Sequence, residues 1–404
     1  MGFHVDLPDV VRFALRRLQN AGFSAYVVGG CVRDSLRGRK PADWDVTTSA
    51  HPSEIQNVFS DEQVIKTGIQ HGTVTLVKNQ MPIEITTYRQ EGNYSDFRRP
   101  DTVEFVNDIR EDLKRRDFTI NAMAYSPQTG LLDLFGGFSD LQNGILRAVG
   151  KPGERFEEDA LRIMRCLRFA AVFSFSIEEA TGAALLEKKK LLGYISAERI
   201  YIEIKKMMTA LAPGEIMTQF FPVLEEIFSA AVQTDLTFMN RLESDLILRL
   251  TAFFCGIYAK EKRIEYTKRA LDSLKTEKKI KNKVLQLTEA VNRQLPTEIY
   301  SIRKELSRMG EEQFARWVNI KEILENVPVT DVLRNFKKIK REKLCYCIKD
   351  LKVDGNDLMK DGNTGTEIGW NLRFLLDSVM AGRVNNQKED LLQYLHQQKK
   401  DWNK

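Results

Sequence analysis

The sequence predicts an α+β chain in which an N-terminal head with a mixed sheet is followed by an all-helical neck, body and tail. β-rich runs that alternate with helical patterns are confined to residues 1–148. From about Pro152 onward the β signal nearly vanishes, and successive helical patterns are separated by short Gly, Pro or Asn breaks. A chain of 404 residues also exceeds one ordinary domain.

The elements of the head follow from residue spacing. Val10–Asn20 has the pattern of an amphipathic helix, and the run AYVVGG after it reads as a buried strand that ends in glycines. Asp43–Thr48 is predicted as a second strand. Gly72–Lys78 (GTVTLVK) and Ile83–Tyr88 (IEITTY) are rich in β-branched residues, and the break Asn79–Pro82 between them predicts a hairpin.

The helical remainder divides at two breaks, LAPG at Leu211–Gly214 and NVPVT at Asn326–Thr330. We therefore expect four domains: the head at residues 1–148, the neck at 149–212, the body at 213–328 and the tail at 329–404.

Composition and signals indicate a globular protein of the cytoplasm. Apolar residues make up 43% and charged residues 29% of the chain, and the longest apolar run, Ile247–Ala259, is broken by Arg249 and is too short to span a bilayer. The segment MGFHVDLPDV lacks the basic and apolar regions of a signal peptide. The five cysteines contain no CxxC pair, which argues against a disulfide framework or a zinc site. We expect no membrane contact, and no protein partner is evident.

The charge balance permits a nucleic-acid partner without requiring one. The net charge is +5, from 61 basic and 56 acidic residues. Lysines cluster at Lys275–Lys283 (KTEKKIKNK) and Lys337–Lys343 (KKIKREK), where helices would carry basic faces suited to phosphate contacts. A solvated helix surface is the alternative for each cluster.

Three acidic residues are candidate metal ligands. On a strand, residues i and i+2 face the same side, so Asp43 and Asp45 are expected to lie together. Mg²⁺ would relieve their repulsion, because it prefers carboxylate oxygens. Glu84 lies on the opposite face of its strand from Ile83 and Ile85 and is available to join the pair. An isolated DxD is more often a solvated turn, so the surrounding motifs have to decide.

Five separated motifs surround these carboxylates: GGCVRD (Gly29–Asp34), DWD (Asp43–Asp45), YRQEGNYSDFRRPDTVEFV (Tyr88–Val106), RRDFTINAMA (Arg115–Ala124) and EEDALRIMRCLRF (Glu157–Phe169). In type and order they resemble the motifs of bacterial-type (class II) tRNA nucleotidyltransferases, the CCA-adding enzymes, in the superfamily of poly(A) polymerase and polymerase beta. The tail segment 353–376 resembles the same family. Three carboxylates after a glycine turn also fit metal-assisted phosphoryl transfer.

The resemblance implies roles for the acidic cluster. Asp43 and Asp45 would bind two Mg²⁺ ions, and Glu84 would orient or deprotonate the attacking 3′-hydroxyl of the tRNA.

The resemblance also implies that Gly30, Arg33 and Arg116 hold the incoming nucleoside triphosphate. Guanidinium groups match phosphate oxygens bidentately, which gives both arginines a physical rationale. The alternative is surface ion pairing of Arg33 with Asp34 and of Arg116 with Asp117.

A helix is expected over Glu157–Phe169, with an apolar packing stripe and a separate charged stripe. The apolar stripe consists of Leu161, Met164 and Leu167, and the charged one of Asp159, Arg162 and Arg165. The bland alternative is an i, i+3 ion pair between Asp159 and Arg162.

The resemblance implies instead that Asp159 and Arg162 act as a protein template for the incoming base. Cytosine and adenine each present an amine donor beside a ring-nitrogen acceptor, whereas uracil and guanine present a carbonyl beside an N–H. An aspartate that accepts and an arginine that donates match the first pattern and clash with the second. Arg165 and Arg168 resemble further nucleotide-contacting positions.

These observations predict a template-independent enzyme that adds C, C and A to the tRNA 3′ end from CTP and ATP, with release of pyrophosphate. The resemblance also implies a mobile loop, after the strand of Glu84, that helps the change from C to A and that relatives restricted to CC lack. Its residues Glu91, Tyr94, Asp96, Arg98 and Arg99 are present, so an enzyme restricted to CC is not expected. An A-only adder and a poly(A) polymerase stay open. The three carboxylates disfavour a non-catalytic RNA-binding module, and four histidines are too few for the phosphohydrolase domain that some relatives carry.

Overall fold

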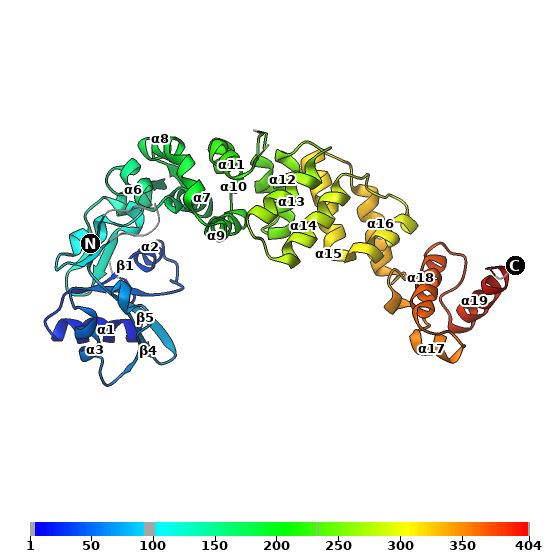
Figure 1. Cartoon of the computed structure of the whole chain (residues 1–404), viewed down its shortest axis with the longest axis horizontal. Coiled ribbons are helices and arrows are strands. Elements are labelled where there is room, and N and C mark those ends of the chain that lie inside the picture. Colours follow the sequence, from blue (N-terminus) through cyan, green and yellow to red (C-terminus); the bar gives the residue numbers. More distant parts are fainter. Residues whose placement is uncertain (1–4, 93–101, 230, 233, 403–404) are drawn as a thin grey trace. The chain divides into compact units, whose positions relative to one another are not determined.

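The computed structural model describes residues 5–92, 102–229, 231–232 and 234–402 (Figure 1). The chain forms two compact units: unit 1 comprises residues 1–240 and 272–275, and unit 2 comprises residues 241–271 and 276–404. The finer division into four domains stays a prediction. Among the described residues, no helix has the length and apolar character needed to cross a membrane.

Unit 1 is built on a seven-stranded mixed sheet with the strand order β3-β4-β5-β2-β1-β8-β9. Strands β2 and β5 pair in parallel, and the other neighbours pair antiparallel. The strands are β1 (Ala25–Val28), β2 (Asp45–Thr48), β3 (Gln63–Ile65), β4 (Thr73–Lys78), β5 (Met81–Thr87), β8 (Met123–Ser126) and β9 (Gly130–Asp133). This arrangement confirms the mixed sheet that the sequence predicts.

The predicted hairpin is formed by β4 and β5. Its two turn residues, Asn79 and Gln80, both have positive φ, 51° and 62°. A two-residue turn with positive φ at both positions matches the right-handed twist of the flanking strands. Ile83 and Ile85 are both 0% exposed, so the apolar face of β5 is buried and its other face, with Glu84, is open.

Helices α1, α2 and α3 pack against this sheet, and the later helices of unit 1, from α6 on, pack mainly against one another. Helix α1 confirms the amphipathic prediction, because it buries Val10, Val11, Ala14, Leu15 and Leu18. The helices are α1 (Asp9–Asn20), α2 (Gly30–Leu36), α3 (Pro52–Val58), α4 (Ile109–Lys114), α5 (Gly137–Asn143), α6 (Pro152–Glu158), α7 (Leu161–Phe173), α8 (Glu179–Lys188), α9 (Ala197–Met208), α10 (Pro213–Gln219) and α11 (Phe221–Ile227).

Two short ladders accompany the main sheet of unit 1. Strands β6 (Arg89–Glu91) and β7 (Val103–Phe105) pair antiparallel. Strands β10 (Ile145–Leu146) and β11 (Ser176–Ile177) pair in parallel. Strand β11 departs from the all-helical neck that the sequence predicts, because two residues are too few to produce a β pattern.

Unit 2 is helical throughout its described residues, as predicted. Helix α15 is interrupted at Gly310, whose φ is 79°. Residues of α17, α18 and α19 share one apolar core that includes Leu358, Leu375 and Leu391. The helices are α12 (Leu246–Ile257), α13 (Arg263–Ser273), α14 (Lys278–Val291), α15 (Ile299–Glu325), α16 (Thr330–Arg341), α17 (Gly355–Lys360), α18 (Thr366–Met380) and α19 (Lys388–Trp402).

Candidate active site

The predicted carboxylates lie at neighbouring positions of the central parallel strands. Asp45 opens β2 and is the register partner of Glu84 on β5. Partners in register point to the same face of a sheet, about 5 Å apart. Asp43 is exposed and precedes β2 instead of lying in it, so the predicted strand is two residues too long at its start. Trp44, 4% exposed, anchors the backbone between the two aspartates.

Asp45 is partly buried and lies within the electrostatic reach of Asp43 and Glu84. Burial, with smaller contributions from the charges of Asp43 and Glu84, raises the pKa of Asp45 to about 6 against the opposing charge of Arg116. Within the described part of the chain, none of the three carboxylates forms an ion pair with a basic side chain. The cluster therefore carries negative charge that the described protein groups leave largely uncompensated.

This donor set fits a Mg²⁺ ion that is shared with substrate. Among the described residues, no three His, Cys, Asp or Glu side chains are grouped closely enough to hold a metal by themselves. Mg²⁺ usually takes one or two carboxylates and completes its shell with water and substrate phosphates. Asp43 and Asp45 supply two hard oxygen donors of that kind.

A glycine turn lies directly beside the two predicted phosphate-binding arginines. Gly29 has a φ of 82°, which disfavours other residues, and a Cβ atom there would lie 3.2 Å from Arg116 Nη1. A Cβ atom at Gly30 would lie 3.5 Å from Arg33 Nη2. The structure thus brings Gly30, Arg33 and Arg116 together, and Arg116 also acts on Asp45.

Arg33 is held by two partners and is 8% exposed. Its Nε and Nη2 atoms donate to Asp34 at 2.9 and 3.0 Å, and Nη1 donates to Asn121 Oδ1 at 2.5 Å. Arg33 and Asp34 therefore form the ion pair that the alternative predicted, but the Arg33 side chain is buried and not at the surface. Asn121 was not predicted as a site residue, although it lies inside the RRDFTINAMA motif.

Arg116 pairs with Asp112 and not with Asp117, so the predicted alternative partner is wrong. Arg116 Nη2 donates to Asp112 Oδ2 at 3.0 Å, and Arg115 Nη2 donates to Oδ1 at 2.8 Å. Asp112 is 0% exposed and also accepts from Thr47 on β2 at 3.4 Å. The helical spacing of Asp112 and Arg116, four residues apart on either side of the end of α4, could have revealed this pair.

Asp159 does not lie on a continuous helix, which corrects the predicted helix over Glu157–Phe169. It ends α6 with φ −136° and ψ 102°, and α7 begins at Leu161. Its Oδ1 accepts from the Leu161 N–H at 3.1 Å, and its carboxylate pairs with Arg199 of α9 at 3.0 Å. Asp is a favoured residue at a helix start, and this was the signal for the break.

Arg162 joins α7 to the head. Its Nη1 pairs with Glu158 at 2.6 Å, and its Nη2 donates to the Arg115 carbonyl at 2.8 Å. The i, i+3 ion pair between Asp159 and Arg162 is absent from these contacts, because each side chain has another partner. Arg162 therefore lies beside residue 115, next to the arginine that acts on Asp45, whereas Asp159 is held by Arg199.

Arg165 strengthens the same junction, whereas Arg168 does not. Arg165 Nε donates to Asp117 Oδ2 at 2.9 Å. Burial alone would raise the pKa of Asp117, but the charge of Arg165 and hydrogen bonds from Asn121 and Arg165 outweigh burial and hold it at about 2. Arg168 pairs with Glu203 of α9 at 2.5 Å and lies over Phe169. The predicted apolar stripe is buried, with Leu161, Met164 and Leu167 at 7%, 0% and 0% exposure.

The loop predicted to help the change from C to A lies outside the described residues at Tyr94, Asp96, Arg98 and Arg99. Glu91 ends strand β6, and its side chain lies outside the description as well.

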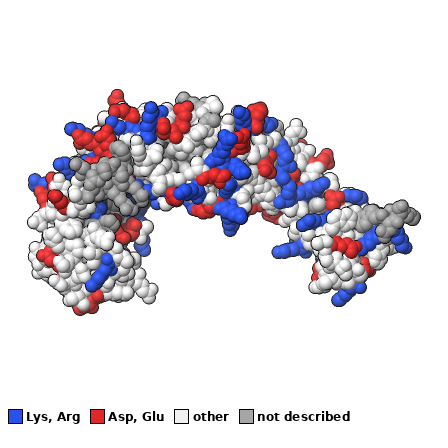
Figure 2. All heavy atoms as spheres, viewed as in Figure 1, with Lys and Arg blue, Asp and Glu red and all other residues white. Residues whose placement is uncertain are grey.

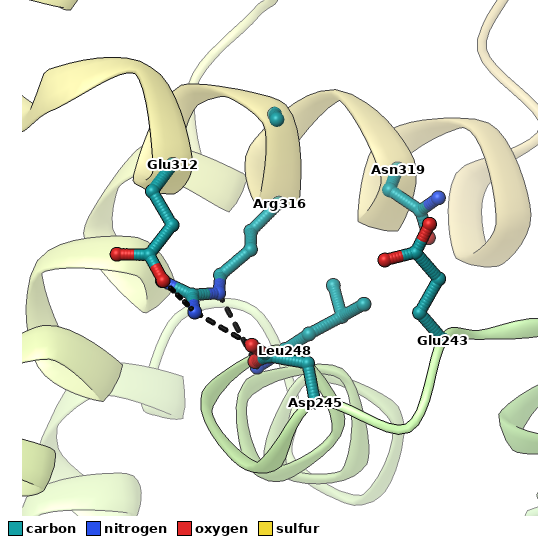
Figure 3. Close-up of a pocket in the computed structure, with 7 residues that line it drawn as sticks. Glu243, Asp245, Leu248, Glu312, Arg316 and Asn319 are labelled. Carbon is teal, nitrogen blue, oxygen red and sulfur yellow. Dashed lines mark hydrogen bonds and ion pairs between the residues drawn. The ribbon is translucent and has the colours of Figure 1, made fainter.

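A pocket of about 330 Å³ in unit 2 contains none of the predicted site residues (Figure 3). Arg316 of α15 points into it and pairs with Asp245 at 2.6 Å and Glu312 at 2.7 Å. Asp245 also caps α12 by accepting from the Leu248 N–H. Arg316 thus pairs with two of the three acidic residues that line the pocket, and we interpret this network as a link between α12 and α15.

The two predicted lysine clusters lie mainly on α14 and α16, and each contains lysines with and without an ion pair. Figure 2 shows Lys and Arg side chains mixed with acidic ones over the helices of unit 2. Lys283 and Lys340 pair with Glu312 and Glu311. Within the described residues, several exposed lysines have no ion pair, namely Lys278, Lys279, Lys337, Lys338 and Lys343.

Comparisons with known proteins bear on both units. Residues 25–147 match the family model of the poly A polymerase head domain, residues 174–226 match the "Probable RNA and SrmB-binding site of polymerase A", and residues 250–395 match tRNA nucleotidyltransferase domain 2. A solved structure of the Bacillus stearothermophilus CCA-adding enzyme in complex with CTP superposes with a TM-score of 0.79 and 26% identity over 97% of this chain and 98% of that one.

Curated relatives agree with these matches. The CCA-adding enzyme of Pediococcus pentosaceus is 49% identical, over 50% of this chain and 51% of its own length. The CCA-adding enzyme of Lactobacillus helveticus is 34% identical over 96% of this chain and 98% of its own length. Because that likeness runs through nearly the whole of both proteins and includes the motifs of the site, this chain belongs to the CCA-adding enzyme family.

Proposed function

We propose that this protein is a template-independent tRNA nucleotidyltransferase that adds C, C and A to the tRNA 3′ end from CTP and ATP. The near full-length likeness to the Lactobacillus helveticus CCA-adding enzyme carries this proposal. The convergence of carboxylates, glycine turn and arginines in one place supports it. Its expected place of action is the cytoplasm, where tRNA and nucleoside triphosphates meet.

The acidic cluster performs the transfer in this proposal. Asp43 and Asp45 would hold Mg²⁺, which would supply neutralisation of phosphate charge and activation of the tRNA 3′-oxygen as a nucleophile. Glu84 orients or deprotonates the 3′-hydroxyl from the neighbouring strand. The 3′-oxygen forms a bond to the α-phosphorus as the bond to the β-phosphate oxygen breaks, and pyrophosphate leaves.

Two arginines bind the triphosphate beside the glycine turn. Asp34 and Asn121 take three of the five N–H groups of Arg33 and leave two for phosphate oxygens. Arg116 is oriented by the fully buried Asp112. The absence of side chains at the glycine pair lets phosphates approach the backbone.

Base selection belongs to Asp159 and Arg162 in the same proposal. The carboxylate of Asp159 accepts from the exocyclic amine of cytosine or adenine, and Arg162 donates to the adjacent ring nitrogen. Uracil or guanine would leave a charged group unpaired at a cost of about 1 to 3 kcal/mol. Arg199 and Glu158, which hold these side chains, keep them oriented before the nucleotide arrives.

The basic helix surfaces bind the tRNA backbone through shape and charge instead of sequence. The exposed lysines of α14 and α16 without ion pairs are the strongest candidates.

The test uses tRNA that lacks its 3′ end, purified protein and Mg²⁺, with each nucleotide offered singly and then CTP with ATP. Two additions with CTP alone and three with both nucleotides support the proposal. The same assay includes tRNA that already ends in CC. Addition of A to that tRNA, without any incorporation of CTP into either tRNA, would show an A-only enzyme. Addition of a long A tail would show a poly(A) polymerase.

A further inference from the structure

The last turns of α7 present an aromatic surface to helix α2. Phe169 and Phe173 are stacked, with ring centroids 5.5 Å apart and planes 12° apart. Phe175 follows with its centroid 5.6 Å from that of Phe173. We call these three rings the phenylalanine surface.

Two arginines from the other side of the junction lie over this surface. The guanidinium carbons of Arg33 and Arg37 are 4.7 and 4.5 Å from the Phe173 centroid. Arg33 is also 5.4 Å from Phe169, and Arg37 is 5.3 Å from Phe175. All four distances are below the roughly 6 Å within which a ring face attracts a cation. Phe173 is the ring that both cations share.

Arg37 meets these rings in place of an ion-pair partner, and the charge of Asp34 acts on it from a distance. Within the described residues it forms no ion pair, and its Nη1 atom is buried without a hydrogen-bond partner. Burial and the neighbouring Arg39 lower its pKa. The phenylalanine surface therefore stabilises a partly buried cation at the C-terminal end of α2, four residues after Arg33.

Arg33 is held differently, by polar groups at its edge and by rings at its face. Asp34 and Asn121 bind its N–H groups in the guanidinium plane. Phe173 and Phe169 lie against the group from the side of α7. Asn121 in turn donates to Asp117, which pairs with Arg165, so a polar link between Arg33 and α7 runs beside the aromatic one.

We propose that Phe173 is a positioning residue for nucleotide binding, whose ring fixes the Arg33 guanidinium for the triphosphate and couples it to the base-selecting end of α7. This inference rests on the proposed function. A nucleotide whose phosphates contact Arg33 and whose base contacts Asp159 and Arg162 requires a fixed distance between these residues. Phe173 helps to fix it, because its ring contacts Arg33 and belongs to α7, the helix that also carries Arg162.

The test compares Phe173→Leu, which keeps apolar volume and removes the ring, with Phe173→Tyr, which keeps the ring. For Phe173→Leu we expect KM for CTP and for ATP to rise about 5- to 30-fold, the range of a desolvated cation–π contact. The kcat value and the affinity for tRNA should change by less than about twofold, since neither depends on this contact. Phe173→Tyr should restore KM to within about twofold of wild type.

Phe13→Leu is the matched control. Its ring also lies beneath cations, Arg17 at 5.6 Å and Lys78 at 4.3 Å, but it belongs to α1 and touches none of the predicted site residues named above. It should lower the thermal midpoint as much as Phe173→Leu while leaving KM for CTP unchanged.

An unchanged KM in Phe173→Leu, or an equal rise in Phe173→Leu and Phe173→Tyr, would overturn the positioning role. Failure of the proposed function looks different, because wild type itself would then add no CTP in the same assay.

Discussion

The carboxylate cluster of the sheet and the charged residues around α6 and α7 differ in charge compensation. In the described part of the chain the carboxylates lack ion-pair partners, whereas the residues around α6 and α7 have them. Asp43, Asp45 and Glu84 meet no ion-pair partner among the described residues, and burial together with mutual repulsion raises the pKa of Asp45. Around α6 and α7, in contrast, each candidate side chain has a partner within about 3 Å. The pairs are Asp159–Arg199, Arg162–Glu158, Arg165–Asp117 and Arg168–Glu203.

This difference separates two kinds of site residue. A carboxylate without an ion-pair partner lowers the free energy of unfolding until a metal cation binds to it. Its removal should therefore lower activity without destabilising the fold. A group that is held by internal partners is oriented in advance, and its removal leaves a partner unpaired, which costs both folding free energy and precision.

The largest effect is expected from Asp45→Asn. Turnover with CTP and ATP should fall about 10³-fold or more, roughly 4 kcal/mol of transition-state stabilisation, because one metal-binding carboxylate is lost. The thermal midpoint without Mg²⁺ should be unchanged or higher, because a repulsive charge has been removed. Asp61→Asn, at a carboxylate that is 62% exposed and paired with Arg17, is the control and should leave turnover unchanged. A large loss of stability in Asp45→Asn would contradict the division.

Asp117→Asn, unlike Asp45→Asn, should destabilise the fold. The free energy of unfolding at pH 7 should fall by about 2 kcal/mol, the value of a carboxyl pKa held near 2 against about 3.9 when unfolded. Urea unfolding measures this loss.

The pH dependence of this difference has a definite sign. Because the folded-state pKa of Asp117 is the lower one, its stabilisation is present above about pH 4 and is lost as the pH falls toward about 2. The gap in unfolding free energy between wild type and Asp117→Asn should therefore shrink from about pH 6 to about pH 3. A gap that widens on acidification would show that Asp117 is not held ionised by Arg165.

Asp159→Ala should loosen the choice of base. The preference for CTP over UTP in kcat/KM should fall about tenfold, or roughly 1.4 kcal/mol, near the lower end of the cost of an unpaired buried group. Affinity for tRNA should stay within about twofold of wild type, because the lost contact is to the nucleotide. Glu154→Ala, at an acid of α6 whose side chain is 56% exposed, is the matched control. Retained discrimination in Asp159→Ala would remove this residue from base selection.

The smallest effect extends the comparison to unit 2. The double variant Lys337→Gln, Lys338→Gln removes two exposed lysines without ion pairs, and Lys340→Gln removes one that is paired with Glu311 at 2.6 Å. The double variant should weaken tRNA binding about two- to fivefold and lower the slope of log K against log salt by about 1 to 2. Lys340→Gln should change both values less. Equal effects would mean that pairing does not decide which lysines bind RNA.

The sequence predicted those structural features that depend on residues close together in the chain. The β4–β5 hairpin, helix α1 and the exposed face of β5 with Glu84 follow from spacing within short runs, and the structure confirms them. The family motifs predicted that the glycine turn, Arg33 and Arg116 lie together, and the structure places them side by side.

Partners that are distant in sequence could not be predicted in this way. Asn121 is 88 residues from Arg33, and Arg199 is 40 residues from Asp159. One sequence carries no record of such contacts. The break at Asp159 was missed for a different reason. No Gly or Pro marks it, and the one local signal was the Asp itself, whose carboxylate accepts from the Leu161 N–H and pairs with Arg199.

The most direct test of the account is a crystal structure of this protein with CTP and Mg²⁺. We predict metal density on Asp43 and Asp45, the triphosphate beside Arg33 and Arg116, and the amine edge of cytosine facing Asp159. A bound CTP whose base edge faces other side chains, or a metal held away from Asp43 and Asp45, would contradict it.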